Sequence, residues 1–420
     1  MTRLNSRLSK EGITKIKSLI DEATINPKTG IPAISLSITN SAGQNLLSYA
    51  NGVNGAESTE KVTTDSLLWI ASCTKLVTTI AVLQLVEQGK LDLDNADQLE
   101  EILPELKSLP IVSLDDGDDG LKLRPKKNRI TLRNLLTHTS GLAYNFLNEP
   151  LAKYSLFFGI PVDIPRSEKE IFLPLIFEPG TSWFYGPGMD AAGVVVERTT
   201  RMKLGQYFEE NIFKPLDITA TFEPDLKSSK NIPHMSYRDQ KTNELNIVTN
   251  PAIDAIFKRG GKDFFHSGGA GLFSTPQQYS KVLTVLINDG ICPISGSKIL
   301  EKETVKSMYV NQLPHLPNYG RLRMVSFSDL TTTISELAPQ PGSPPQGWGL
   351  SFFMPIEPLG TGRSTLSGSW SGISNCFYFF DKENGVSMVL GSQVLPFIDE
   401  RVLGLFIQLE LTLFEHLEKN

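Results

Sequence analysis

The 420-residue sequence contains little cysteine and little histidine. Its three cysteines, Cys73, Cys292 and Cys376, are widely separated and odd in number, which predicts neither a disulfide framework nor a CxxC metal site. The five histidines show no HExxH or other paired spacing, so we expect no metal site. GxGxxG and P-loop motifs are also missing, so we expect no nucleotide. The sequence predicts a cofactor-free protein of a reducing compartment.

Positive charge is not in excess, and long apolar runs are absent. Lysine and arginine number 40 against 46 aspartates and glutamates, for a net charge of -6 and a pI near 5.6. This balance does not favour a polyphosphate partner such as nucleic acid. No stretch reaches the roughly 18 apolar residues of a membrane span, and residues 1–10 lack the apolar core of a signal peptide. We therefore expect a cytoplasmic protein that binds neither nucleic acid nor membranes.

Apolar periodicity predicts helices at both ends of the chain, with strands beside them. The expected segments are a helix over 8–24, strands over 33–38 and 45–50, a buried helix over 76–86, strands over 376–380 and 386–390, and a helix over about 400–417. Gly89 is placed to end the buried helix, and Asn384-Gly385 favours a hairpin turn. Between about 90 and 220 we expect mostly helical segments separated by loops, among them the acidic stretch 115–120.

This element order predicts an α+β fold in which both ends of the chain form one unit. An antiparallel sheet is flanked by the N- and C-terminal helices, and a mainly helical domain is inserted between them. The predicted division is residues 1–70 with 225–420 as a discontinuous α+β sheet domain, and residues 71–224 as the helical domain.

Ser72 and Lys75 are the strongest candidates for chemistry because a long apolar helix begins on them. Residues three apart lie on one face of a helical turn, so the hydroxyl and the amine can meet. Free backbone N–H groups and the positive dipole end at a helix N-terminus suit a developing oxyanion. Burial favours the neutral amine of a lysine, which can act as a base. The alternative is that Ser72 only caps the helix.

Two other segments bear on this motif. The same spacing recurs at Ser295-Gly-Ser-Lys298, where no buried helix follows closely, and we interpret that match as a surface turn. Tyr185 lies between the aromatic pair 183–184 and the glycine-proline loop 186–188, which can hold its hydroxyl rigidly. The alternative for Tyr185 is an ordinary core tyrosine with a satisfied hydroxyl.

Ser72-x-x-Lys75, Tyr185 and Trp370-Ser371-Gly372 occur in the order typical of penicillin-recognising serine hydrolases, and the sequence resembles their class C β-lactamase and esterase branch. The segments 131–142 and 268–276 are similar to further landmarks of that family. The resemblance is closer still to the fungal lovastatin-type acyltransferases, or transesterases. It is carried by the segments 71–80, 129–133, 138–144 and 185–186, covers about residues 10–415, and implies a class C β-lactamase-like fold.

The resemblance also implies a role for each matching residue. Ser72 attacks an acyl donor, while Lys75 and Tyr185 share the proton transfers as general base and acid. The backbone N–H groups of Ser72 and Ile373 form the oxyanion hole. Tyr144 lines the acyl or acceptor pocket. The further substrate-binding candidates are Trp370, Gly372 and Trp69.

Three positions depart from the family patterns. β-Lactamases have Lys-Thr-Gly where this chain has residues 370–372, so the lysine that grips a substrate carboxylate is missing. They also have asparagine where this chain has Pro187. The fungal acyltransferase has arginine three residues before the nucleophile, where this chain has Trp69. These departures move the expected substrate away from β-lactams, and the tryptophans near the landmarks suit either a bulky apolar substrate or packing.

Two residues near these motifs receive a structural interpretation. His138 is expected to order a turn by hydrogen bonding rather than to act as a base. Cys73, although it adjoins Ser72, is expected to point to the other side of the helix and to serve packing.

Three functions are compatible with these observations. The first is a serine-nucleophile acyltransferase of secondary metabolism, which moves an acyl group from a thioester donor to a small-molecule hydroxyl or amine. An acyl carrier protein of a polyketide synthase is one candidate carrier of that donor. The second is an esterase or β-lactamase-like hydrolase, with water as acceptor. The third is a non-catalytic binding protein, against which the intact Ser72, Lys75 and Tyr185 argue.

Overall fold

A seven-stranded antiparallel sheet forms the centre of the computed structural model, which describes residues 6–115, 118–224, 232–248, 264–320, 324–328, 331 and 346–418. In spatial order its strands are β10 (Gln346–Trp348), β11 (Phe353–Pro355), β12 (Ser367–Gly372), β13 (Cys376–Asp381), β14 (Val386–Gly391), β2 (Ala33–Asn40) and β3 (Asn45–Gly52). Two strands from the N-terminal part therefore complete a sheet built mostly from the C-terminal part. Both predicted hairpins are confirmed, since β2 pairs with β3 and β13 pairs with β14.

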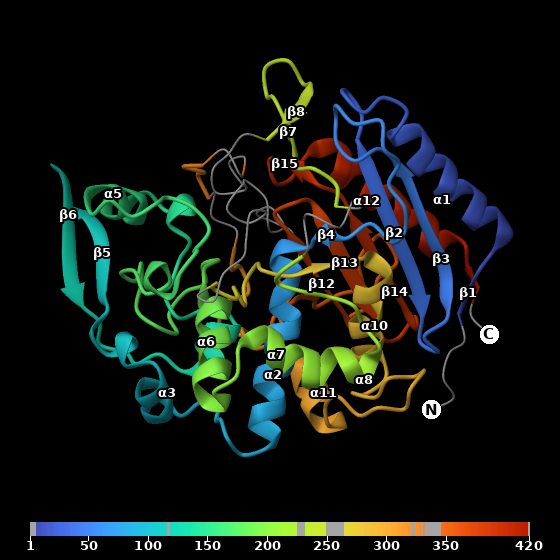
Figure 1. The fold of residues 1–420 in the computed structure, drawn as a ribbon. Coiled ribbons are helices and arrows are strands. Elements are labelled where there is room, and N and C mark those ends of the chain that lie inside the picture. The colour runs from blue at the N-terminus through green and yellow to red at the C-terminus, as the bar shows by residue number, and fades with distance from the viewer. Residues whose placement is uncertain are drawn as a thin grey trace.

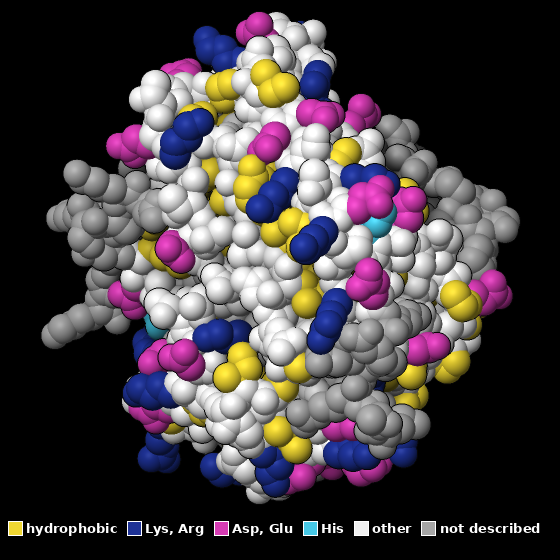
Figure 2. Space-filling view, turned by 90° about the vertical axis from the view of Figure 1, so that its right-hand side faces the viewer, with side chains coloured by type: hydrophobic (Ala, Val, Ile, Leu, Met, Phe, Trp, Pro, Cys, Tyr) yellow, Lys and Arg dark blue, Asp and Glu magenta, His cyan; other side chains and the backbone are white. Residues whose placement is uncertain are grey.

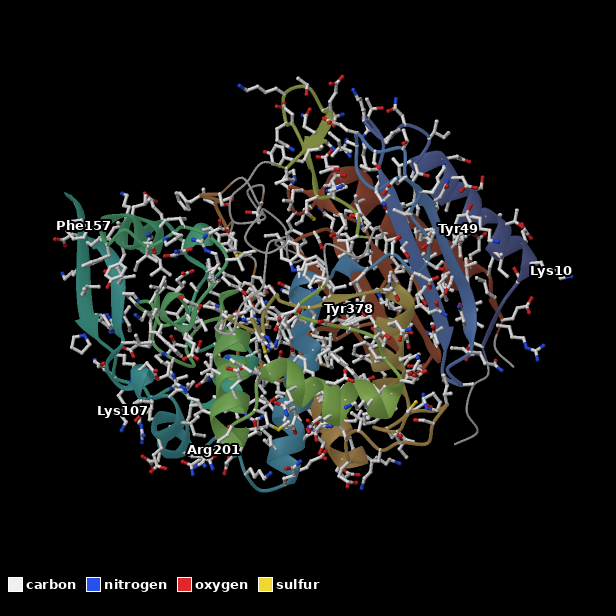
Figure 3. All side chains as sticks on the ribbon, viewed as in Figure 1. Lys10, Tyr49, Lys107, Phe157, Arg201 and Tyr378 are labelled. Atoms are coloured by element: carbon white, nitrogen blue, oxygen red, sulfur yellow. The ribbon has the colours of Figure 1, made fainter. Side chains whose placement is uncertain are left out.

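Alternate side chains of β13 face two separate layers of helices. Phe377 and Phe379 belong to the hydrophobic cluster that holds the first layer, whereas Tyr378 and Phe380 belong to the cluster that holds the second. The first layer is α1 (Lys10–Ala23) with α12 (Glu400–Glu415), and the second is α2 (Thr74–Glu87) with α10 (Pro276–Ile287). Tyr378, labelled near the middle of Figure 3, marks the place where the sheet meets the second layer. The predicted α+β sheet with terminal helices beside it is confirmed.

Helix α2 runs through the middle of the molecule (Figure 1). Its residues Thr74–Leu85 are all buried, which accounts for a sequence that is apolar nearly all round. Gly89 has a φ of +67° and ends the helix as predicted, and its N–H donates to the carbonyl of Val86. The first turn of α2 is therefore fixed on every side by packing.

Three small sheets connect distant parts of the chain. They are β1 (Arg7–Leu8) with β16 (Leu417–Glu418), β4 (Leu68–Trp69) with β9 (Phe273–Ser274), and the group β15 (Val394–Leu395), β7 (Ser236–Arg238) and β8 (Leu245–Ile247). The pairing of β4 with β9 brings the residues just before α2 beside those just before α10. This contact places the start of α2 next to the turn at residues 268–270. No sequence motif predicts that these two segments are neighbours.

The segment from 90 to 220 is mainly helical but also contains a β-hairpin. The helices are α3 (Ala96–Ile102), α4 (Leu132–Leu136), α5 (Glu149–Phe157), α6 (Gly188–Thr200), α7 (Leu204–Phe208) and α8 (Lys214–Leu216), and α11 (Lys302–Met308) follows α10. Residues 115 and 118–120 of the acidic stretch, expected as a loop, lie in β5 (Pro110–Asp115) and β6 (Asp118–Pro125), which pair with each other, whereas residues 116–117 lie outside the described residues. Val112 and Leu121 pack with Leu151 of α5, but the residues of β5 do not alternate regularly between buried and exposed, so no clear strand pattern marks it.

The two-domain division, residues 1–70 with 225–420 against 71–224, is kept as a proposal. The block of α3, α5, α6, β5 and β6 beside the sheet in Figure 1 supports it. The largest hydrophobic cluster nevertheless contains residues of both parts, such as Leu76 of α2 and Leu283 of α10. The two parts therefore share a core.

The outer surface on the side of α1 and β3 carries basic and acidic side chains interspersed with single apolar ones (Figure 2). Within the described ranges, no helix is long and apolar enough to cross a membrane.

The burial of α2 predicts a large stability cost when a side chain is removed from it. Ile80 is 0% exposed, so Ile80→Ala leaves a cavity and should lower the free energy of unfolding by about 2–5 kcal/mol. Ile25→Ala makes the same chemical change at a side chain that is 79% exposed and should stay within about 0.5 kcal/mol of the parent. Urea unfolding monitored by tryptophan fluorescence measures both, and equal midpoints for the two variants would contradict the central place of α2.

Candidate active site

Ser72 lies in a short 3-10 turn, Ala71–Cys73, that joins β4 to α2. Ala71 has a φ of 44°, which costs a residue other than glycine of the order of 1–3 kcal/mol and turns the chain sharply. Helix α2 starts at Thr74, so Ser72 lies in the turn just before the helix rather than on its first turn. Ser72 is only 8% exposed and lines a pocket.

The side-chain nitrogen of Lys75 lies among three oxygen atoms. Its Nζ is 3.1 Å from Ser72 Oγ, 3.1 Å from Tyr144 Oη and 2.8 Å from the carbonyl oxygen of Gly269. The lysine is 1% exposed. Because a buried polar group without partners costs several kcal/mol, these oxygens are what allows the nitrogen to be buried. The structure thus brings Ser72 and Lys75 together, as their spacing predicts.

Tyr185 meets Lys75 through its ring face. The ring centroid lies 4.7 Å from Lys75 Nζ, and Trp370 Nε1 donates to the Tyr185 hydroxyl over 3.4 Å. The rings of Tyr185 and Trp370 are 5.3 Å apart. Tyr185 lines the same pocket as Ser72, and a tyrosine hydroxyl is a group that can give or take a proton.

Tyr144 lines the pocket with its ring, as expected, but its hydroxyl points to the interior. That hydroxyl lies between Lys75 and the carboxylate of Asp190, to which it donates over 3.4 Å. Burial, and next the charge of Asp190, raise the pKa of Tyr144 well above its usual value. Asp190 was not predicted from the sequence, although a lone carboxylate in the otherwise small and apolar run 188–196 was a signal.

The pocket beside Ser72 has a cavity volume of about 40 Å³. Its lining is mostly apolar and aromatic: Ser72, Tyr144, Phe146, Leu147, Ile164, Tyr185, Ala270, Thr331, Trp370, Ser371, Ile373 and Phe397. Gly372 lies directly against the serine turn, since a Cβ there would be 2.4 Å from the carbonyl oxygen of Ile70. Only glycine permits this approach. The oxyanion hole from the N–H groups of Ser72 and Ile373 stays a prediction that this arrangement permits.

Trp69 is not brought to the pocket. It is 0% exposed in β4, and its indole N–H donates to the carbonyl of Ala270 over 2.6 Å. The expectation that Trp69 binds substrate is therefore not supported by its position. The side chain packs in a hydrophobic cluster with Ala71 and Phe273.

His138 does not order a turn through its ring, contrary to our expectation. Both ring nitrogens are buried without a hydrogen-bond partner among the described residues, and the ring packs against Trp183, Tyr185 and Trp348. Its backbone carbonyl instead accepts from the N–H of Phe184. Burial, and then the charge of Lys75, lower the pKa of His138 well below its usual value. The His138 ring therefore serves packing, in contact with the ring of Tyr185.

Two other expectations near the motif are confirmed. Cys73 is buried in the main hydrophobic cluster, and burial raises the pKa of its thiol well above the usual value. Ser295 lies in an exposed turn and bonds to the carbonyl of Pro215, while Lys298 pairs with Glu301. Across the described ranges, no group of three or more His, Cys, Asp or Glu side chains is arranged to hold a metal ion.

Comparison with known proteins follows the same landmarks. A model of the β-lactamase family matches residues 16–410. The chain belongs to the β-lactamase family. It is 32% identical to monacolin J acid methylbutanoyltransferase of Aspergillus terreus over 79% of this chain and 77% of that protein. It is 33% identical to lovastatin esterase of Penicillium rubens over 79% of this chain and 81% of that protein.

Solved structures give the same grouping. Simvastatin synthase (LovD) of Aspergillus terreus superposes with a TM-score of 0.77 at 26% identity, covering 97% of this chain and 98% of that one. EstCE1, a hydrolase with promiscuous acyltransferase activity, has a TM-score of 0.71 at 18% identity over 96% and 99% of the two chains, and shows the fold alone. The class C β-lactamase-like fold and the likeness to lovastatin-type acyltransferases are thus confirmed, and the chain is an enzyme of this family.

Buried His138 predicts a pH dependence of stability. The unfolded chain takes up a proton on this histidine near pH 6.5, whereas the folded state keeps the ring neutral, so stability is lost as the pH falls below about 6.5. For one group the slope approaches about 1.4 kcal/mol per pH unit. His138→Asn, which tolerates the positive φ of 56°, should lose less stability between pH 6.5 and 5. Urea midpoints measured across this range test it, and an unchanged slope would contradict it.

Proposed function

We propose that this enzyme is an acyltransferase that moves an acyl group from a thioester donor to a hydroxyl or amine of a small molecule, through an acyl-enzyme on Ser72. The observation that carries the proposal is the buried contact of 3.1 Å between Lys75 Nζ and Ser72 Oγ at the edge of a mainly apolar pocket. A nucleophile and a base within hydrogen-bond reach form the unit needed for covalent catalysis.

In the first half-reaction, Lys75 takes the proton of Ser72 while Oγ attacks the thioester carbonyl. The negative charge on the carbonyl oxygen is stabilised by the N–H groups of Ser72 and Ile373. The carbon–sulfur bond then breaks, the thiol leaves with a proton supplied through Lys75 or Tyr185, and Ser72 carries the acyl group as an ester.

In the second half-reaction, the acceptor hydroxyl or amine gives its proton to Tyr185 or Lys75 and attacks the acyl-enzyme carbonyl. Tyr185 is our candidate for this step because it lines the pocket while its ring lies over Lys75. Breakage of the ester bond returns the proton to Ser72 Oγ. The apolar wall, which includes Trp370 and Phe397, excludes water and favours a bulky acceptor over hydrolysis.

The relatives suggest the class of substrate. Monacolin J acid methylbutanoyltransferase and acyltransferase mokF of Monascus pilosus, which is 33% identical over 69% of this chain, support transfer to a small molecule in secondary metabolism. An acyl carrier protein of a polyketide synthase is our proposed donor carrier. A cytoplasmic location belongs to the same proposal and is supported by three free cysteines.

Hydrolysis is the second candidate function. The similarity to lovastatin esterase, which is 33% identical over 79% of this chain, favours hydrolysis. The same Ser72 acyl-enzyme then gives its acyl group to water, so the two functions differ only in the second half-reaction.

Partition of the acyl group separates the two functions. The protein is incubated with a methylbutanoyl thioester of N-acetylcysteamine, with and without a panel of polycyclic alcohols and amines that includes monacolin J acid. Transfer predicts an acylated acceptor, with the release of free methylbutanoic acid suppressed as acceptor is raised. Free acid formed at the same rate at saturating acceptor would contradict the transferase.

The two Ser-x-x-Lys motifs of this chain supply a matched control. Ser72→Ala should abolish both transfer and hydrolysis, whereas Ser295→Ala, at an exposed turn, should leave both rates within twofold of the parent. Retained turnover in Ser72→Ala would rule out the proposed nucleophile.

A further inference from the structure

We propose that Tyr144 and Asp190 are positioning residues that fix the direction of the hydrogen bonds made by Lys75, so that the lysine presents its lone pair to Ser72. This inference rests on the proposed acyl-enzyme mechanism and goes beyond the pocket-lining role expected of Tyr144. It assigns a function to a buried carboxylate that the reaction does not otherwise use.

Three oxygen atoms surround Lys75 Nζ. The carbonyl oxygen of Gly269, at 2.8 Å, can only accept a hydrogen bond. Tyr144 Oη has one proton, and its neighbour on the far side is the Asp190 carboxylate, which accepts when ionised. When the tyrosine proton goes to Asp190, the tyrosine oxygen is left to accept from Lys75.

These two acceptors use two N–H bonds of Lys75. The remaining tetrahedral position on Nζ faces Ser72 Oγ at 3.1 Å. In the neutral amine that position is the lone pair, so it is aimed at the serine proton. In the ammonium form it is the proton just taken, aimed at the oxygen that must receive it when the ester breaks. Without the tyrosine acceptor, rotation of the amine would leave the lone pair undirected.

Asp190 fixes both acceptors at once. Its Oδ2 accepts from Tyr144, while its Oδ1 accepts from Ser267 Oγ at 2.5 Å and from the Gly269 N–H at 3.1 Å. The turn that supplies the Gly269 carbonyl is therefore held by the same carboxylate that orients Tyr144. A Cβ at position 269 would lie 2.2 Å from Oδ2, so this approach requires glycine.

Burial and the neighbouring charges act in opposite directions on the protonation of Asp190. Asp190 is 1% exposed but lies in the first turn of α6, where the helix dipole favours a negative charge. Burial raises its pKa, and Lys75 is the largest opposing influence. Tyr144 stays protonated because burial and the Asp190 charge raise its pKa. The hydrogen bond consequently runs from tyrosine to carboxylate.

The hydroxyls of Tyr144 and Tyr185, two tyrosines that both lie near Lys75, thus have different hydrogen-bond partners. The Tyr185 hydroxyl is bonded to Trp370 beside the pocket, whereas the Tyr144 hydroxyl is bonded within the protein. We assign proton exchange with substrate to Tyr185 and the positioning role to Tyr144.

The test measures single-turnover acylation of Ser72 by p-nitrophenyl butyrate in the parent, Tyr144→Phe, Asp190→Asn and the double variant. We expect each single change to lower the acylation rate constant 10- to 100-fold, with the substrate concentration at half-maximal rate changed less than threefold because the ring remains. The double variant should be no slower than the worse single one, since both changes break one unit. Rate constants within twofold of the parent, or losses that multiply in the double variant, would overturn the inference.

Tyr49→Phe is the matched control. Its hydroxyl also donates to an aspartate, Asp21, over 2.6 Å, but it lies on β3 at the outer side of the sheet (Figure 3). In the Tyr49→Phe variant, Ser72 should be acylated at the parent rate. Ser72→Ala separates the two proposals: acylation retained there overturns the proposed function, whereas acylation lost there but normal in Tyr144→Phe overturns the positioning role alone. Should Asp190→Asn prove unfolded by circular dichroism, Tyr144→Phe and its unchanged half-maximal concentration decide the matter.

Discussion

The burial of the Lys75 amine is the constraint on which the rest of the structure depends. A lysine 1% exposed is tolerated only where oxygen atoms replace its water shell. The three that do so come from the turn before α2, from the residue 144 loop and from the turn at 269. The fold must bring these segments together to within hydrogen-bond distance. Stability and catalysis therefore depend on the same contacts.

Two close backbone approaches make that arrangement possible. The pairing of β4 with β9 brings the 267–270 turn beside α2, and Gly269 admits the Asp190 carboxylate where any side chain would clash. On the other side, Gly372 lets the end of β12 lie against the carbonyl of Ile70. Strand β12 of the seven-stranded sheet thus places residues of the pocket wall next to Ser72.

Much of the fold could be predicted from the sequence, because α2, the β2–β3 and β13–β14 hairpins and the terminal helices each have a clear apolar period. Ser72 and Lys75 were predicted because their spacing on one turn already implies contact. The β5–β6 hairpin was missed because the residues of β5 do not alternate regularly between buried and exposed. Asp190 was missed, and Trp69 misplaced, because their positions depend on contacts between segments about 75 to 200 residues apart. No local pattern records such contacts.

The central claim is that acyl transfer passes through Ser72. The most direct measurement is mass spectrometry of the protein quenched in acid during turnover of an acyl thioester, followed by fragmentation of the peptide that contains residues 72 and 75. The account predicts a mass increase equal to one acyl group, located on Ser72, which disappears when acceptor is added. Transfer that proceeds with no acyl group on the protein, or with the group on the adjacent Cys73, would contradict it.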